Sequence, residues 1–146
     1  MSKSNTFEND LLQLIFNNVD IADIGDAGGL QNSATAGSLY VALHTGDPGE
    51  AGTAATNESA YTSYARVAVA RSGAGWTVSG NSATNAALIQ FPECTGGSET
   101  ITHVSITTSS SGTSKILYSG ALSASRSVSS GIQPQFAASA LTVTED

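Results

Sequence analysis

Two histidines and the residues around them are the first candidates for chemistry in this chain. His44 ends an alternating apolar run and is followed by the sequence Asp47-Pro48-Gly49. A metal or catalytic site is one interpretation. A structural turn is the other, because an Asp side chain hydrogen-bonds to the backbone that follows it and Pro fixes its own φ at a value suited to turns. His103 lacks any recognisable nucleophile and carboxylate partner, and no G-x-S-x-G or H-E-x-x-H motif is present. The pattern favours the turn and predicts no enzymatic activity.

One cysteine and three aspartates are weaker candidates. A single Cys94 excludes an intrachain disulfide and a cysteine-based metal site. Asp20, Asp23 and Asp26 recur every third residue, whereas an EF-hand loop places ligands at alternate positions and closes on a glutamate. The expectation is a solvated connector, with Ca²⁺ binding as the alternative. We predict no cofactor and no required metal.

Charge and hydropathy exclude several classes of partner. The net charge is −7 with five Lys and Arg, too few for the basic face that nucleic-acid or anionic-membrane binding needs. No apolar run approaches the roughly 20 residues of a membrane span, and no secretory signal is visible. Charged residues make up only 12% of the chain. Two interpretations of this weakly charged, hydroxyl-rich surface stay open: coverage by neighbouring proteins, or ordinary hydroxyl-rich β loops.

The N-terminal segment differs from the rest by its helical periodicity. We predict a helix over about residues 6–17, with Asn5 as N-cap and Glu8 completing a capping box. Its apolar stripe consists of Phe7, Leu11, Leu14 and Ile15. A helix of this length is marginal alone, so it must pack on something. Either it docks on a neighbouring protein as a tether, or it folds back on its own chain.

Short alternating segments dominate the remainder and predict an all-β fold. The expected strands are 39–44, 65–71, 76–78, 86–91, 101–107, 115–120, 132–136 and 140–144. Their number and the turn signals between them favour an antiparallel β-sandwich, jelly-roll-like. The expected core comprises Val41, Leu43, Val67, Val69, Trp76, Leu88, Phe91, Val104, Ile106, Leu117 and Val143. We predict a helical arm and linker over residues 1–37 and a β-sandwich domain over residues 38–146.

The stretch 45–62 interrupts the strand rhythm and is long enough to suggest a functional loop. Glycan stacking on its flanking tyrosines is one interpretation, but such a pair more often anchors a loop. Arg66 is expected to pair with Glu58, worth about 1 kcal/mol or less if the pair is exposed. The interface candidates are the helix stripe Phe7, Leu11, Leu14 and Ile15 together with Asp47, Pro48, Glu58, Tyr61, Tyr64 and Arg66.

A family resemblance is carried by residues 39–49 and by the segment that follows them. The chain reads LYVALHTGDPG, then NE, then YTSYARVAVAR, with Trp76, Asn85, Phe91 and Pro92 downstream. This pattern resembles a family of small tailed-phage virion proteins, some labelled head decoration and others tail fibre. The resemblance covers about residues 39–107.

The resemblance implies a non-enzymatic structural protein of a phage particle. Jelly-roll cement proteins that sit as dimers on the head make the head-cement role the first expectation. Such a protein would bind across major capsid protein subunits, stabilise the capsid as a homodimer or other homo-oligomer, and lie on the capsid exterior after synthesis in the host cytoplasm. The alternative is a tail-fibre or receptor-binding and glycan-binding tail module.

Overall fold

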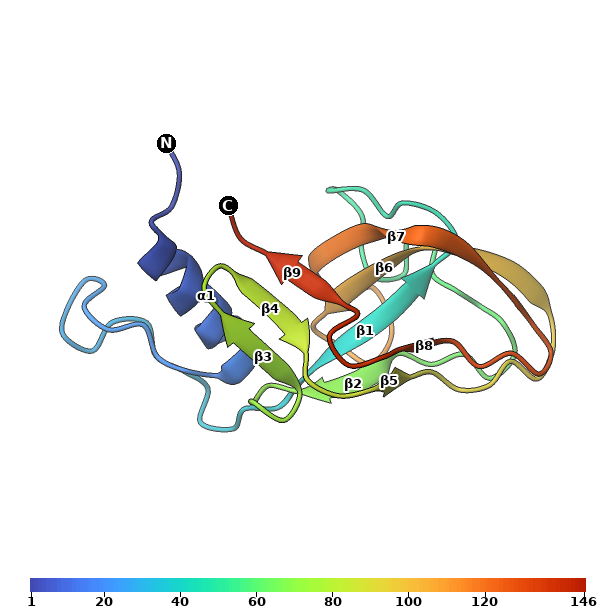
Figure 1. Cartoon of the computed structure of the whole chain (residues 1–146), viewed down its shortest axis with the longest axis horizontal. Helices are drawn as coiled ribbons and strands as arrows, with labels where there is room; N and C mark the ends of the chain where they lie inside the picture. The colour runs from blue at the N-terminus through green and yellow to red at the C-terminus, as the bar shows by residue number, and fades with distance from the viewer. The chain divides into compact units, whose positions relative to one another are not determined.

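The computed structural model describes residues 1–146 and contains one helix and nine strands (Figure 1). In chain order these are α1 (Asn5–Asn17), β1 (Ser38–His44), β2 (Val67–Ala70), β3 (Trp76–Ser79), β4 (Ser82–Asn85), β5 (Ile89–Gln90), β6 (Ser98–Thr107), β7 (Ile116–Ser129), β8 (Gln135–Phe136) and β9 (Thr142–Thr144). The predicted class, antiparallel β with one short N-terminal helix, is confirmed.

The strands form three open sheets. The largest has the order β2-β1-β6-β7, the second β3-β4-β9, and the third pairs β5 with β8. In the largest sheet β1 and β6 run antiparallel, with Tyr40 opposite Thr107 and His44 opposite His103. No sheet closes into a barrel, because each order begins and ends on a different strand.

Two compact units account for the chain. Unit 1 joins residues 1–38, 69–88 and 136–146, and unit 2 joins residues 39–68 and 89–135. The predicted boundary after residue 37 lies next to the point, after residue 38, where the chain passes from unit 1 to unit 2. However, residues 69–88 and 136–146 belong to unit 1 again. The division into a helical arm and a separate β domain therefore stays a prediction.

The helix begins one residue earlier than expected. Ser4, not Asn5, is the N-cap, and its hydroxyl accepts from the backbone N–H of Phe7 at 3.3 Å. The capping box predicted with Asn5 is therefore wrong, because the cap precedes Asn5 and shifts Glu8 one position further into the helix. At the other end Asn18 adopts a left-handed conformation, which short polar residues tolerate, and ends the helix.

The buried face of α1 differs from the predicted stripe. Leu12 and Phe16 are fully buried, Glu8 nearly so, and these positions lie four residues apart on one side of the helix. In the predicted stripe Phe7 is exposed, and Leu11, Leu14 and Ile15 are half-buried. The sequence could not separate the two faces, because apolar residues occur on both.

Within unit 1 the helix packs on its own chain, beside the β3-β4 hairpin (Figure 1). The Phe16 and Trp76 rings have centroids 4.7 Å apart, and Asn9 donates to the carbonyl of Gly80 at 2.9 Å. Arg71 donates to the carbonyls of Leu14 and Ile15, near the C-terminal end of the helix. The fold-back alternative describes this packing, and α1 is not a free tether.

Most predicted core residues are buried, but three are not. Leu88 is 52% exposed because its segment is a bend, and Ile89 in β5 is buried in its place. Val67 and Leu117 are only half-buried because they belong to β2 and β7, the two edge strands of the largest sheet. No helix is both long enough and apolar enough to cross a membrane.

Candidate functional site

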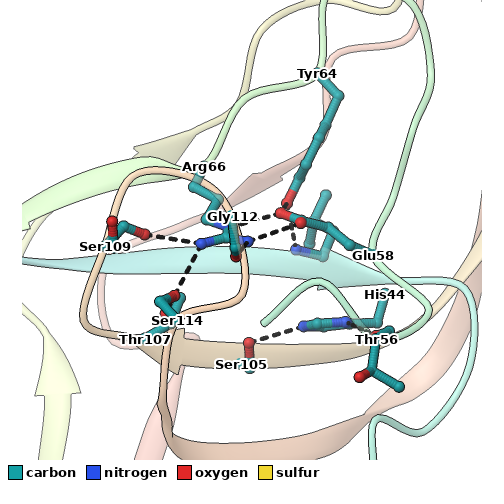
Figure 2. A network of polar contacts seen from close by, with 11 residues as sticks. His44, Thr56, Glu58, Tyr64, Arg66, Ser105, Thr107, Ser109, Gly112 and Ser114 are labelled. Carbon is teal, nitrogen blue, oxygen red and sulfur yellow. Dashed lines mark hydrogen bonds and ion pairs between the residues drawn. The ribbon is translucent and has the colours of Figure 1, made fainter. Parts of the chain in front are cut away.

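A network of polar side chains in unit 2 joins two loops to the largest sheet, and we call it the arginine clasp (Figure 2). Its members are His44, Thr56, Glu58, Tyr64, Arg66, Ser105, Thr107, Ser109, Gly112 and Ser114. The two loops are residues 45–57, after β1, and residues 108–115, between β6 and β7. We refer to them as the first loop and the second loop.

The first loop begins with the predicted turn, which is confirmed. A carboxylate oxygen of Asp47 accepts from the N–H of Gly49 at 2.8 Å, and Gly49 has φ +68°. The side chain of Asn57 donates to the carbonyl of Asp47 at 2.9 Å, while the N–H of Thr45 donates to the carbonyl of Asn57 at 2.8 Å. These bonds close the loop at its base, and Glu58 then pairs with the end of β1.

Arg66 forms a two-point ion pair with Glu58. Its Nε lies 2.6 Å from Oε1 of Glu58, and one terminal nitrogen lies 2.8 Å from Oε2. The predicted pair is thus confirmed, but its environment is not the exposed one expected. The arginine side chain is 1% exposed and the glutamate side chain 19%. The hydrogen bond that Arg66 donates to Glu58 and the attraction of the carboxylate charge raise the pKa of Arg66.

The remaining N–H groups of Arg66 bind the second loop. One terminal nitrogen donates to the carbonyl of Ser109 and the hydroxyl of Ser114, both at 3.0 Å. The other donates to the carbonyl of Gly112 at 2.7 Å. A guanidinium has five N–H donors in a rigid fork, and every one is used here. A lysine could not reproduce this pattern, because its ammonium carries three N–H donors on one nitrogen and lacks the planar fork of the guanidinium.

Two further bonds attach the second loop to its surroundings. The hydroxyl groups of Ser114 and Thr107 are hydrogen-bonded to each other. The N–H of Ala54 in the first loop donates to the carbonyl of Ser114 at 2.9 Å, and Ala54 is fully buried. The two loops therefore contact each other directly as well as through Arg66.

The tyrosines beside the first loop are packed inward. Tyr64 donates from its hydroxyl to Glu58 at 3.1 Å and accepts from the N–H of Leu43 at 3.0 Å. Its ring stacks on Phe91 and meets Tyr61 edge-on. Burial raises the pKa of Tyr64, and burial also raises the pKa of Tyr61 to about 12. The pair anchors the chain after the first loop.

His44 connects β1 to the first loop and to β6. Its Nδ1 lies 2.9 Å from the carbonyl oxygen of Thr56, and its Nε2 lies 2.8 Å from Oγ of Ser105. Because a carbonyl only accepts, Nδ1 carries the proton, and in the neutral ring Nε2 accepts from Ser105. Burial lowers the pKa of His44 below 6.5, and the charges of Arg66 and His103 act in the same direction.

This serine–histidine contact does not form a nucleophilic site. His44 is 0% exposed and Ser105 1%, so a substrate cannot reach the hydroxyl. The nearby carboxylate of Glu58 is occupied by Arg66 and Tyr64 and does not orient the imidazole. The arrangement stabilises a loop and has no geometry for group transfer.

Elsewhere, the acidic connector shows no metal geometry. No group of three or more His, Cys, Asp or Glu side chains is placed to hold a metal ion. Asp20 accepts from the N–H of Asn32 at 2.6 Å, and Asp26 accepts from the N–H of Gly28 at 2.8 Å. Asp26 organises a local turn, and Asp20 joins two distant parts of the connector.

The interface candidates divide between the two units. The helix residues belong to unit 1. In unit 2, Asp47 and Pro48 lie in the first loop, and the residues that follow this loop are Glu58, Tyr61, Tyr64 and Arg66. Sequence reasoning missed the second loop and Ser105. A buried arginine with one carboxylate partner needs further acceptors, but only the folded structure shows that Arg66 is buried. Two of the acceptors are backbone carbonyls, which have no sequence signature.

Comparison with known proteins assigns the chain to a family. A family model described as podophage GP4 fiber I protein gp80 matches residues 2–144. The chain belongs to this family. It is therefore a virion structural protein of a podophage tail fibre, and the family is a structural rather than an enzymatic one. No curated protein matches the chain.

Membership of the gp80 family corrects the head-cement expectation, together with the major capsid partner and the capsid location that it implied. The tail-fibre alternative is the better description. Low charge, short strands and the lack of an active site are shared by head and tail structural proteins, so these features could not distinguish the two.

Proposed function

We propose that this gp80-family chain is a preorganised binding module of the tail fibre, whose first and second loops together form the contact surface for another fibre or tail protein. The observation that carries the proposal is the buried Arg66, which uses all its donors to bind the second loop and Glu58, the residue that directly follows the first loop. A monomer does not need two exposed loops fixed in this way for its own core.

Preorganisation is the energetic advantage of such a surface. Ordering flexible loops on binding costs free energy, so loops that are already held in place bind more tightly for the same contacts. Small exposed residues occur on both loops, Ala51 and Ala55 in the first and Ser110, Ser111 and Thr113 in the second, and the exposed charges Asp47, Glu50 and Lys115 lie towards the ends of this surface or beside them. Hydroxyl and methyl groups are less costly to desolvate than charges.

The residue types favour a protein partner over a glycan. Neither loop contains an aromatic residue on which a sugar ring could stack. The flanking Tyr61 is buried, and Tyr64 is covered by Phe91 on one ring face. Among the interface candidates, Pro48 is buried within the first loop, Glu58 and Arg66 support the loops from beneath, and Asp47 is exposed.

Incorporation into particles tests the proposal. A phage lacking this gene is complemented with the double variant Ala55→Arg and Ser111→Arg, or with the control Ala34→Arg at an exposed connector residue. We expect the loop variant to keep its circular dichroism spectrum and melting temperature but to be lost from purified tails. The control should be incorporated normally.

Two outcomes would overturn the proposal. Full incorporation of the loop variant together with normal infection would show that the loops are not a contact surface. Full incorporation combined with loss of adsorption to cells would assign the loops to a host receptor instead of a fibre or tail protein.

A further inference from the structure

The outer face of the β3-β4-β9 sheet, in unit 1, carries only hydroxyl side chains. Successive residues of a strand point to opposite faces of a sheet, and residues directly opposite each other on neighbouring strands share a face. The three strands lie side by side with β4 in the middle (Figure 1). Their register aligns two rows across one face: Thr77, Thr84 and Thr142 form the first, and Ser79, Ser82 and Thr144 the second. We call this surface the hydroxyl face.

The opposite face of the same sheet is the one that packs within unit 1. Its residues Trp76, Ala83, Asn85 and Val143 are buried. The ring of Trp76 packs against that of Phe16 in α1, with centroids 4.7 Å apart. On the hydroxyl face the side chains of β3 and β9 are exposed, and the two in the middle strand β4 are half-buried between them. The hydroxyl face is therefore open to solvent, while the helix covers its reverse side.

None of the six hydroxyl groups on this face has a hydrogen-bond partner within the chain. In the arginine clasp, by contrast, the hydroxyl groups of Ser105, Thr107 and Ser114 are all bonded. A hydroxyl group can donate one hydrogen bond and accept two. Six such groups can therefore bind another array of hydroxyl groups, and the same face of a second copy is such an array.

Charge also favours a second copy at this face. The chain carries a net charge of −7, so most approaches of two copies bring acidic surfaces together. Residues 72–88 and 136–144, which include all three strands, contain no charged side chain. Glu145 and Asp146 follow β9, but Lys3 lies 3.1 Å from the Glu145 carboxylate and donates to the carbonyl of Asp146. Two hydroxyl faces can therefore meet without acidic repulsion.

We propose that the hydroxyl face packs against the hydroxyl face of a second copy of this chain, with β4 of one copy over β4 of the other. The side chains are spaced about 4.8 Å apart across the strands and about 6.8 Å apart along them, and a second copy has the same spacings. A two-fold axis between the sheets places middle strand on middle strand and makes the contact self-complementary. Threonine methyl groups become buried, and the hydroxyl groups bond across the contact.

The size of the face sets the strength of this contact. Three strands of three to four residues cover an area about 14 Å on each side, much less than the roughly 800 Å² per partner of a standard interface. The pair is therefore weak in dilute solution. It forms when copies are concentrated or are held together in one tail fibre, where the effective concentration reaches about the millimolar range.

Cross-linking of a central cysteine detects such a weak contact in the full chain. Thr84→Cys places a thiol on β4, whereas the native Cys94 is fully buried and stays unreactive while the protein is folded. The matched control is Thr100→Cys, at an exposed threonine of β6 in unit 2. Each folded variant, checked by circular dichroism, is treated with a short bismaleimide at its highest soluble concentration. The rate of covalent dimer formation is the readout.

We expect Thr84→Cys to form covalent dimers at least about tenfold faster than the control, because the contact raises the local thiol concentration. Adding Ser82→Lys or Ser82→Glu to Thr84→Cys should lower the rate to that of the control, because like charges then face each other. An equimolar mixture of the two charged variants should restore it. If Ser82→Lys or Ser82→Glu does not fold, the same charges at the exposed Thr142 take their place.

Two results would overturn the proposal: a Thr84→Cys rate equal to that of the control, or a rate that neither charge changes. The loop variant Ala55→Arg and Ser111→Arg, combined with Thr84→Cys, should cross-link as fast as Thr84→Cys alone. Because both loops belong to unit 2 and the hydroxyl face belongs to unit 1, failure here leaves the proposed loop surface untouched.

Discussion

Replacing Arg66 with alanine is the most direct test of the clasp. The change leaves the carboxylate of Glu58 without its ion pair and removes the donor from the carbonyls of Ser109 and Gly112. Breaking a buried pair by removing one partner typically costs about 3–5 kcal/mol. Glu58 keeps the hydroxyl of Tyr64 as a donor and is 19% exposed, so water can reach it. We therefore expect the lower end, about 3 kcal/mol.

Urea unfolding followed by circular dichroism measures this loss. For a chain of this size, about 3 kcal/mol lowers the melting temperature by roughly 6–12 °C. Stability typically amounts to about 5–15 kcal/mol, so the variant should still fold. Arg126→Ala removes an exposed arginine and is the matched control, with an expected change within about 0.5 kcal/mol.

Hydrogen exchange locates the effect in the structure. In Arg66→Ala the amides of both loops should exchange faster than in the wild type, whereas those of β3 and β4 should not. Arg66→Lys should fall between the two, because lysine keeps the charge but not the fork. A loss below about 1 kcal/mol for Arg66→Ala, or loops that remain protected, would refute the claim that the guanidinium holds them.

Three further predictions concern pH and packing. The folded chain lowers the pKa of His44, so the unfolded chain binds that proton more readily, and the contribution of His44 to stability should be constant above about pH 6.5 and fall as the pH drops below it. His44→Asn should remove this part of the slope in urea titrations at several pH values. Phe16→Ala should cost about 3–5 kcal/mol in thermal unfolding, because its ring is fully buried. Phe7→Ala, on the exposed side of the helix, should cost less than about 1 kcal/mol, and a larger loss would contradict the assigned helix face.

The local parts of this fold were readable from the sequence. A helix over residues 6–17, the Asp47-Pro48-Gly49 turn and the alternating strand ending at His44 follow from periodicity and from the φ preferences of single residues. The pairing of Arg66 with Glu58 was also readable, since the two residues are opposite charges close together in the chain. In each case the residues that interact lie within a few positions of one another.

The remaining features depended on contacts between distant segments. β4 has the polar sequence Ser-Ala-Thr-Asn, which shows no apolar alternation, and it forms a strand because β3 and β9 pair with it. The helix has apolar residues on both sides, and the position of Trp76 decides which side is buried. Neither outcome is encoded by any short window of residues.

The clasp shows the same division most clearly. The sequence determined that an arginine and a glutamate stand near a long loop, composition determined that the chain is acidic, and the alternating segments indicated that it is β-rich. Only the tertiary structure decided that Arg66 is buried and that its other partners are backbone carbonyls and a hydroxyl 43–48 residues further along the chain. Backbone carbonyls are identical in every residue, so only the folded path of the chain can select which of them a buried donor meets.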